Sequence, residues 1–389
     1  MAAEVAAFVQ RAAADVPALA ARLSQAGLDP AALEPGDLDR LPVLSKDAVI
    51  ALQAQDPPFG GLLAAGAQVE RLYQSPGPIY EPQLAGPDPW RWGPALRAAG
   101  IGAGDRVLNC FGYHLSPAGA MFDEGCLGLG ASVVPGGIGN HDLQVRAIAD
   151  VGITAYTGLP SYLKSLLDRW SEADIPWDRW RLRCALVTAE PLPDTLRALL
   201  MERVEVVLMA YGTAEVGLIG YETAPGSGLR PADGMLIEIC DLDTGAPITQ
   251  GHGQVVVTVL RPEYPLVRFG TGDLSAWTLD ADGELRLAGV LGRVGEATKV
   301  RGMFLHPSQA RAALADCPGL QSWRLLVDRV DHRDELTCEV VAAEGVAAAD
   351  LIELVGRRIR DRLRFAAAVT LVDAIPEGGA TLTDRRTWD

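Results

Sequence analysis

A cysteine and a histidine four residues apart form one pair in this sequence that could carry out chemistry. Cys110 ends the apolar run DRVLNCFG (105–112), and His114 lies in the segment that follows. A neighbouring base can turn a thiol into a nucleophile, so Cys110 is a candidate nucleophile with His114 as its base. A cysteine at the end of a buried strand is more often a small apolar filler, so this structural interpretation stays open. Cys126, in MFDEGCLGLG, is the second candidate thiol.

The spacing of the six cysteines predicts neither a metal centre nor a disulfide framework. There is no Cys-x-x-Cys pair and no zinc-like spacing of cysteine and histidine. The alanine-rich start carries Glu4 and Arg11, unlike a signal peptide. No uninterrupted apolar run reaches the length of about eighteen residues that a membrane helix needs. We therefore expect reduced thiols, a cytoplasmic location, no metal and no membrane partner.

The net charge of −16 argues against a nucleic-acid partner, because a protein that neutralises phosphates needs a basic face. The charge is unevenly distributed along the chain. Residues 293–389 hold 14 Lys+Arg against 15 Asp+Glu, so nearly all of the acidic excess belongs to residues 1–292.

Helical stretches alternate with apolar runs between about residues 90 and 290, which is typical of an α/β domain with a mainly parallel sheet. Residues 253–260 and 284–292 resemble antiparallel strands. Residues 1–70 have a helical pattern, with Ser45 as the N-cap of one helix. The strands expected in the parallel sheet are 105–112, 131–137, 183–190 and 204–212.

After Arg293 the pattern changes to short units. They are a helix near 307–316, strands near 321–330 and 335–343, a helix at 349–365 and a strand at 367–375. This order predicts a small α+β domain of residues 293–389, joined near a hinge at Glu296 to an α/β domain of residues 1–292. The predicted fold class is therefore α/β, with a large N-terminal domain and a small C-terminal domain that we expect to be mobile.

Four segments, in order, resemble the adenylate-forming superfamily. They are LPVLSKDAVI (41–50), AYGTAEVG (210–217), YPLVRFGTGDL (264–274) and LGRVGEATKVRGMFLHPSQ (291–309). With NCFGYHLSPAGAMF and TGLPSYL, they are similar to its phenylacetate-CoA and 2-aminobenzoate-CoA ligase branch over nearly the whole chain. In that family a carboxylate attacks the ATP α-phosphate, and a pantetheine thiol then displaces AMP from the acyl-adenylate.

The resemblance assigns roles to residues within these motifs. Tyr211 would stack on adenine, and Glu215 would hold magnesium. Asp273 would bind the ribose hydroxyls, and Arg293 would contact the ribose near the hinge. These residue types suit the roles, since carboxylates accept from vicinal hydroxyls and bind hard cations, and a guanidinium offers a planar fork of donors.

The phosphate loop departs from the family pattern. In the family this loop is rich in small and hydroxyl residues and ends in Lys-Pro, whereas here it is SPGPIYEP (75–82). Pro76 and Pro78 have no N–H to donate to a phosphate, and Glu81 stands where the family has lysine. A carboxylate beside a triphosphate would repel it.

A second departure is a missing lysine. The C-terminal lysine of the family bridges the carboxylate and the α-phosphate, but Lys299 is the last of only three lysines here, after Lys46 and Lys164. Residues 378–380, Gly-Gly-Ala, fill the corresponding region. Losing such an electrostatic anchor typically costs about a hundredfold or more in rate. Both departures affect adenylation, so ATP and magnesium are not expected as cofactors.

The half of the site that handles thiols is kept. Residues 302–309 match the face that the family turns inward for thioester formation, and Tyr113, Tyr162 and Cys126 lie in segments that match its acyl pocket. Exchange of one thioester for another needs no ATP. The resemblance therefore implies transfer of an aromatic, anthraniloyl-like acyl group from a CoA thioester to the phosphopantetheine of an acyl carrier protein, a reaction known in secondary metabolism. If one tunnel serves both thiols, the acyl group would pause on Cys110.

Five arginines lie on the predicted amphipathic helix LIELVGRRIRDRLRF (351–365). A solvated face is the simplest interpretation. Arg357, Arg358 and Arg360 could also meet CoA phosphates or dock an acidic carrier protein, which the acidic remainder of the chain would repel.

Two other functions stay open. One is an ATP-dependent aryl-CoA ligase with an unusual phosphate loop, and the other is a non-catalytic homologue that binds an acyl-CoA. The retention of Glu215 and Asp273 would fit either structural relics or a site that still binds an adenosine group, including that of CoA.

Overall fold

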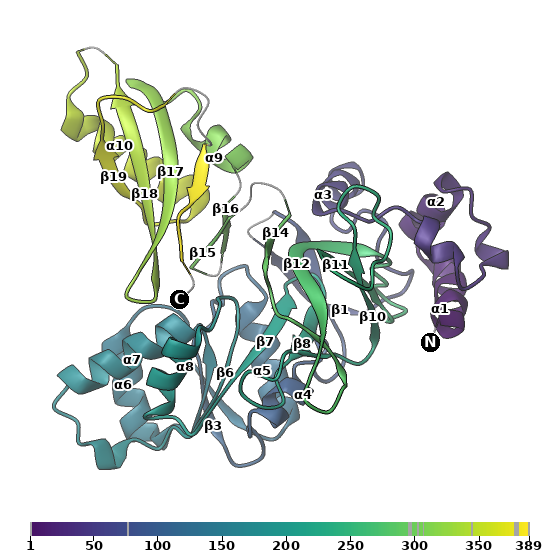
Figure 1. Cartoon of the computed structure of the whole chain (residues 1–389), viewed down its shortest axis with the longest axis horizontal. Helices are drawn as coiled ribbons and strands as arrows, with labels where there is room; N and C mark the ends of the chain where they lie inside the picture. Colours follow the sequence, from purple (N-terminus) through teal and green to yellow (C-terminus); the bar gives the residue numbers. More distant parts are fainter. Residues whose placement is uncertain are drawn as a thin grey trace. The chain divides into compact units, whose positions relative to one another are not determined.

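The structure is a computed structural model that describes residues 2–75, 78–294, 298–301, 303–305, 307–343, 345–376 and 381–387. The chain divides into two compact units, Met1–Val294 and Gly295–Asp389 (Figure 1). The sequence placed this division after residue 292. Glu296, the expected hinge, lies outside the described residues.

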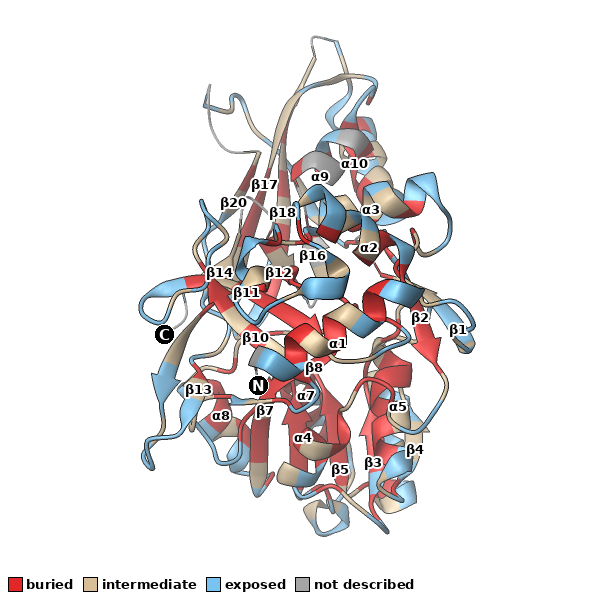
Figure 2. Cartoon of the chain, turned by 90° about the vertical axis from the view of Figure 1, so that its right-hand side faces the viewer, coloured by how far each residue is buried: buried red, intermediate tan, exposed pale blue. Residues whose placement is uncertain are grey.

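A seven-stranded sheet forms the centre of the larger unit, in the order β4-β3-β5-β6-β7-β8-β9. The first five strands are parallel, as the sequence predicted, and β8 and β9 continue the sheet as antiparallel strands. The inner strands are short apolar runs that are largely buried (red in Figure 2), as expected for a parallel sheet covered on both faces. The strands are β3 (Arg106–Asn109), β4 (Ser132–Pro135), β5 (Ala155–Gly158), β6 (Cys184–Val187), β7 (Val206–Thr213), β8 (Gly217–Tyr221) and β9 (Arg230–Pro231).

Helices cover both faces of this sheet, because successive strand residues alternate between two hydrophobic clusters. Val107 packs with α4 and α5 on one face, and Leu108 packs with α6, α7 and α8 on the other. The connection β3-α5-β4 and the connection β5-α7-β6 therefore lie on opposite faces, and the winding switches between β3 and β5. In open α/β sheets, ligands bind outside the carboxyl ends of the strands at such a point. The helices are α4 (Gly93–Ala98), α5 (Ala118–Gly128), α6 (His141–Ala147), α7 (Pro160–Glu172) and α8 (Asp194–Met201).

A second sheet in the same unit is antiparallel. Its order is β10-β11-β12-β13, and β14 pairs with β12. The antiparallel strands predicted at 253–260 and 284–292 are confirmed by β11, β13 and β14. The strands are β10 (Met235–Cys240), β11 (His252–Val259), β12 (Phe269–Leu279), β13 (Leu285–Leu287) and β14 (Gly292–Arg293).

The first seventy residues are mainly helical, as predicted. Ser45 caps α3, since its side chain accepts a hydrogen bond from the Ala48 N–H at 3.1 Å. The buried guanidinium of Arg268 donates to the carbonyls of Leu38 and Leu41, which ties this helical segment to the antiparallel sheet. The elements are α1 (Ala2–Asp15), α2 (Pro17–Gln25), α3 (Lys46–Gln55) and the hairpin β1 (Val69–Gln74) and β2 (Tyr80–Leu84).

The smaller unit is an α+β domain, as predicted, with a four-stranded sheet in the order β19-β18-β17-β20. The central pair is antiparallel and both outer strands are parallel to their neighbours. β20 was not predicted, because three residues give too short a pattern to detect. The elements are β15 (Thr298–Val300), β16 (Met303–Leu305), α9 (Pro307–Leu314), β17 (Leu320–Val330), β18 (Arg333–Ala342), α10 (Ala348–Leu363), β19 (Ala368–Leu371) and β20 (Leu382–Asp384).

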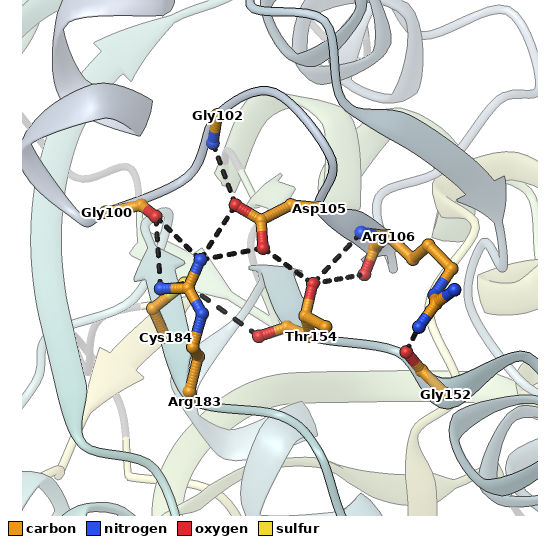
Figure 3. A network of polar contacts seen from close by, with 8 residues as sticks. All are labelled: Gly100, Gly102, Asp105, Arg106, Gly152, Thr154, Arg183 and Cys184. Carbon is orange, nitrogen blue, oxygen red and sulfur yellow. Dashed lines mark hydrogen bonds and ion pairs between the residues drawn. The ribbon is translucent and has the colours of Figure 1, made fainter.

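A polar network joins the amino ends of three parallel strands (Figure 3). Asp105, just before β3, accepts two hydrogen bonds from Arg183 Nη2, at 2.7 and 2.9 Å. The Thr154 hydroxyl, just before β5, donates to Asp105 Oδ1 at 2.7 Å and accepts from the Arg106 N–H. These contacts fix the relative positions of β3, β5 and β6 at the edge opposite their carboxyl ends.

No helix in the described part of the chain is both long enough and apolar enough to cross a membrane.

Candidate active site

The carboxyl ends of the parallel strands bring most of the predicted site residues to one edge of the central sheet. Tyr113 follows β3, Tyr162 lies in the first turn of α7 after β5, and Tyr211 lies near the end of β7. Glu215 occupies the turn between β7 and β8. Because parallel strands end at the same edge, residues separated by a hundred positions or so become neighbours there.

Asn109, the last residue of β3, organises the centre of this edge. Its amide nitrogen lies 2.8 Å from Asp123 Oδ1, 2.8 Å from the Gly119 carbonyl and 3.0 Å from Tyr113 Oη. Its amide oxygen accepts from the Thr157 hydroxyl, at the end of β5, at 3.2 Å. Asn109 is fully buried, so these partners satisfy it where water cannot.

Tyr113 and Asp123 are held together above Asn109. The Tyr113 hydroxyl donates to Asp123 Oδ1 at 2.8 Å. The Tyr113 ring lies against Gly119 on α5, where a Cβ would come within 2.7 Å of Cδ1 of the ring. Burial, together with Asp123, raises the pKa of Tyr113, which keeps the phenol a neutral donor. Burial also raises the pKa of Asp123, although Asn109 and Tyr113 favour its ionised form.

Tyr162 fixes the glycine-rich loop that follows β4. Its Oη accepts from the Gly139 N–H at 2.8 Å and lies 2.7 Å from Gln144 Oε1. Its ring stacks on His141, with the centroids 4.6 Å apart. Burial raises the pKa of Tyr162 to about 12. The structure therefore shows Tyr162 positioning a loop at the expected acyl pocket.

Cys110 faces away from Asn109, into the hydrophobic cluster on the face of α6, α7 and α8. The residue is 1% exposed, and burial raises the pKa of its thiol. His114 is exposed in the following loop, and no described hydrogen bond joins it to Cys110. Burial in apolar surroundings disfavours the thiolate form of a cysteine. The Cys110–His114 nucleophile stays a prediction, and the burial of Cys110 is also what the apolar-filler interpretation expects.

Cys126 is also fully buried, in the cluster formed by α4, α5 and the sheet. Burial raises the pKa of this thiol as well. Cys126 packs in the core, and its place in the acyl pocket stays a prediction.

Three of the predicted nucleotide residues form one hydrogen-bonded group. Tyr211 Oη lies 2.9 Å from Asp273 Oδ2 and 3.1 Å from the Thr271 hydroxyl. Arg293 Nε lies 3.0 Å from Asp273 Oδ1, and Arg293 and Asp273 are also direct partners in the pairing of β12 with β14. Burial and Asp273 raise the pKa of Tyr211, so its hydroxyl remains a donor to the carboxylate. This group links the two sheets of the larger unit.

Glu215 forms a buried ion pair with Lys46, which lies at the start of α3 and also approaches the Phe269 ring. Burial opposes the ionisation of Glu215, but Lys46 outweighs it and lowers the pKa. Glu215 also lines a small pocket of about 30 Å³, together with Trp90, Arg91 and Tyr264. The positive charge beside the Glu215 carboxylate is therefore supplied by the Lys46 side chain.

Glu81 points into the interior from β2 and is 1% exposed. The Ser75 hydroxyl lies beside it, but neither carboxyl oxygen has a hydrogen bond of normal geometry from a described residue. Burial, followed by the charge of Glu215, raises the pKa of Glu81 well above its usual value. Glu81 is thus a buried acid whose neutral form is favoured, because the charged form would have no water around it, and its predicted place facing a triphosphate stays a prediction.

The described backbone amides of the phosphate loop are used within the protein. The Ser75 N–H donates to the Ile79 carbonyl at 2.9 Å, and the Tyr80 N–H donates to Gln53 Oε1 at 2.8 Å. Residue 78 is proline and Ile79 is fully buried. The N–H groups of Ser75 and Tyr80 are therefore engaged within the protein, whereas such loops normally bind a phosphate through their backbone amides.

Comparison with known proteins identifies the family. A phenylacetate-coenzyme A ligase of Aromatoleum evansii is 30% identical over 336 residues, covering 80% of this chain and 75% of the relative. The chain belongs to the phenylacetate-CoA ligase family. A phenylacetate-coenzyme A ligase of Thermus thermophilus is 28% identical over 397 residues, covering 92% of this chain and 87% of the relative. A scan against protein-family models found no match.

The fold agrees with this family. A 2-hydroxyisobutyryl-CoA ligase in complex with 2-HIB-AMP and CoA superposes with a TM-score of 0.87 at 23% identity, covering 98% of this chain and 89% of the ligase. An amide bond synthetase from Marinactinospora thermotolerans gives a TM-score of 0.58 at 20% identity, covering 78% and 65% of the two chains. The chain is thus a ligase-like member of the adenylate-forming superfamily, as the motifs indicated.

Within this phenylacetate-CoA ligase fold, the arginines of α10 have different environments. Arg358 donates to the carbonyls of Ala315 and Asp316, which follow the C-terminal end of α9. It therefore helps to hold the smaller unit together, and its docking role stays a prediction. Arg357 is exposed, with Glu353 3.9 Å away, and Arg360 is exposed as well.

The structure also shows polar contacts near the predicted site residues that the sequence did not indicate. Asp123 joins the Asn109 group, and Glu190, after β6, accepts from the Ser161 hydroxyl at 2.5 Å while nearly fully buried. In the sequence Lys46 stood out only as one of three lysines, and this rarity could have pointed to a specific role such as its ion pair with Glu215. Nothing in the local sequence indicated the partners of Asp123 or Glu190. The predicted region around residues 378–380 and Gly302 lies outside the described residues.

Proposed function

We propose that this chain transfers an aromatic acyl group from CoA to the phosphopantetheine thiol of a carrier protein without consuming ATP. The observation that carries the proposal is the phosphate loop. Its Ser75 and Tyr80 amides donate within the protein, two of its residues are proline, and Glu81 replaces the lysine of the family. The sequence also lacks the C-terminal lysine that would bridge the α-phosphate. Adenylation loses its electrostatic support on both counts.

The proposed exchange balances without a nucleotide. The thiolate of the acceptor attacks the thioester carbonyl, a new carbon–sulfur bond forms, and the bond to the CoA sulfur breaks. The proton lost by the acceptor thiol ends on the CoA thiol. One thioester replaces another of similar energy, so the step needs no hydrolysis of a phosphoanhydride.

The metal site of the family does not fit these residues. Glu215 is the carboxylate expected to hold magnesium, and Lys46 already neutralises it at hydrogen-bond distance. No group of three or more His, Cys, Asp or Glu among the described residues could hold a metal ion. Magnesium prefers several oxygen ligands in octahedral geometry, which one lysine-paired carboxylate does not provide. The retained group of Tyr211, Asp273 and Arg293 would instead receive the adenosine part of CoA.

The acyl group passes directly between the two thiols in this proposal. An acyl-enzyme would require the Cys110 thiol, which lies in an apolar cluster and has a raised pKa. The acceptor is an acidic carrier protein that meets the exposed Arg357 and Arg360 of α10. The anthraniloyl transferase of aurachin-type biosynthesis, which the sequence resembles, catalyses a reaction of this kind. All six cysteines are buried free thiols, which fits a reducing cytoplasm.

The test measures both half-reactions on the purified chain. Aryl acids with ATP, magnesium and labelled pyrophosphate should give no exchange, and aryl-CoA with phosphopantetheinylated carrier should load the carrier without ATP, as detected by intact mass. Serine substitution of Arg357 and Arg360 should raise the carrier KM and flatten its salt dependence. Robust pyrophosphate exchange combined with no ATP-independent loading would refute the proposal.

An ATP-dependent aryl-CoA ligase is the second candidate. The retained Tyr211, Asp273 and Arg293, and the ligase names of the relatives, favour it. Formation of aryl-AMP and then aryl-CoA in the same assays would establish this alternative.

A further inference from the structure

The inference concerns the acyl group and rests on the proposed function. It starts from the crevice that the topology predicts, outside the carboxyl ends of β3 and β5 where the winding of the sheet switches. The Thr157 hydroxyl, at the end of β5, donates a hydrogen bond to Asn109, at the end of β3. The loop after β4 adds glycines at 136, 137 and 139 and an exposed Ile138, which is 65% exposed. Small residues and an exposed apolar side chain suit the approach of an aromatic acyl group.

Asp123 places a carboxyl acceptor in these surroundings. Its Oδ1 receives two donors, the amide of Asn109 and the hydroxyl of Tyr113, both at 2.8 Å. No hydrogen bond from a described residue reaches its Oδ2, and the side chain is only partly buried. Arg71, the nearby cation, donates instead to Glu124 at 2.9 Å. One oxygen is therefore fixed by the protein and the other is available.

This arrangement differs from a purely structural carboxylate, which would use both oxygens. A carboxylate accepts hydrogen bonds and cannot donate them while it is ionised. Asn109 and Tyr113 hold its orientation before any ligand arrives, so a ligand pays little to order it. The matching ligand group is a hydrogen-bond donor carried by an apolar, aromatic body.

We propose that Asp123 recognises an amino substituent on the aromatic ring of the acyl substrate, through its free Oδ2. An aromatic amine is a neutral donor, and it therefore enters a partly buried site at a lower desolvation cost than a cation. Asp123 sets the preference for aminobenzoyl over benzoyl groups, and Tyr113 positions its carboxylate.

The experiment compares binding of benzoyl-CoA, 2-, 3- and 4-aminobenzoyl-CoA and 2-hydroxybenzoyl-CoA by calorimetry, and their transfer rates where transfer occurs. The parent chain should prefer one aminobenzoyl isomer to benzoyl by about 10- to 100-fold, the worth of one hydrogen bond to a charged group. Asp123→Leu should reduce this ratio to near one, and the isosteric Asp123→Asn should reduce it partly. Glu124→Gln changes the neighbouring carboxylate, which does not contact Asn109, and should leave the ratio unchanged.

Several outcomes overturn the inference. A parent ratio near one would do so, as would Asp123 variants that weaken all thioesters equally, because that would make Asp123 only a support for Tyr113. If Asp123→Leu does not fold, the test uses Asp123→Asn and Tyr113→Phe. An unchanged ratio of aminobenzoyl to benzoyl binding in both variants refutes the inference. If the parent chain binds 2-hydroxybenzoyl-CoA more tightly than every aminobenzoyl isomer, the site recognises a hydroxyl group and the inference is wrong. The binding ratios are independent of transfer, so failure of the proposed function leaves this test intact.

Discussion

The buried acid at residue 81 makes the stability of the protein depend on pH in a specific direction. Glu81 is enclosed, faces Glu215, Lys46 and Tyr264, and has no described hydrogen-bond donor of normal geometry. Its pKa is raised in the folded chain, so between the unfolded value of about 4.3 and the folded value only the folded state holds the proton. The folded state then binds more protons than the unfolded state, and stability falls as pH rises through this window.

The magnitude follows from linkage. Each pH unit between the two pKa values costs the parent chain about 1.4 kcal/mol, and the cost becomes constant above the folded pKa. Glu81→Gln keeps the shape and removes the ionisation. Near the unfolded pKa, the melting temperature of this variant should therefore approach that of the parent. At higher pH the variant should melt at a higher temperature than the parent, and the difference should grow by roughly 3 °C per pH unit for a domain of this size.

The assay is calorimetric or fluorescence-detected melting between pH 5 and 8 at constant ionic strength. Glu70→Gln is the matched control, since Glu70 is exposed on the same hairpin and its substitution should not change the slope. Parallel curves for the parent and Glu81→Gln would show that Glu81 does not carry a raised pKa. Glu81→Lys should destabilise the chain, because it adds an ammonium beside Lys46, and it should not restore adenylation.

Three further predictions concern individual side chains. Arg358→Ser should lower the stability of the smaller unit by about 1 kcal/mol, because two carbonyls after α9 lose their donor, whereas exposed Arg357→Ser should leave melting unchanged. Asp105→Ala should lower the free energy of unfolding by about 2 kcal/mol, since Arg183 and Thr154 lose their shared acceptor. A decrease below about 0.5 kcal/mol in chemical unfolding would contradict a stabilising role for the polar network in Figure 3. The Cys110→Ala variant should transfer the acyl group at a rate within a few fold of the parent, and intact mass measurement should detect no acyl adduct on the parent. If a folded Cys110→Ala variant transfers nothing, the acyl-enzyme hypothesis is supported instead.

Much of the fold could be predicted because it depends on local patterns. Apolar runs bounded by turns identified β3, β4, β6 and β7, and helices between them required a parallel sheet. Ser45 predicted the start of α3, because the hydrogen bond between its hydroxyl and the Ala48 N–H joins residues only three positions apart. The three-residue β20 was missed, since its place depends on pairing with β17 and not on its own pattern.

The candidate site was predicted less completely. The motifs grouped Tyr211, Asp273 and Arg293, and the structure brings these side chains into contact. The sequence placed Cys110 at the acyl site because it ends the predicted strand, just before the loop expected to line that site. Strand alternation turns neighbouring residues to opposite faces, so Asn109 faces α5 and Cys110 faces the other cluster. The local sequence contained the alternation, but only the packed helices decided which residues lie on which face of the sheet.

What the sequence alone determined is the chemistry that the chain lacks. The prolines of the phosphate loop remove N–H donors, and the absence of any lysine after Lys299 removes a cation, in every conformation. What the tertiary structure decided is the state of the groups that remain. Lys46 pairs with Glu215 across 169 positions, and Glu81 is an interior group whose neutral form is favoured by burial and by the charge of Glu215. Charge state depends on water and on neighbours, and both are fixed only when distant segments pack together.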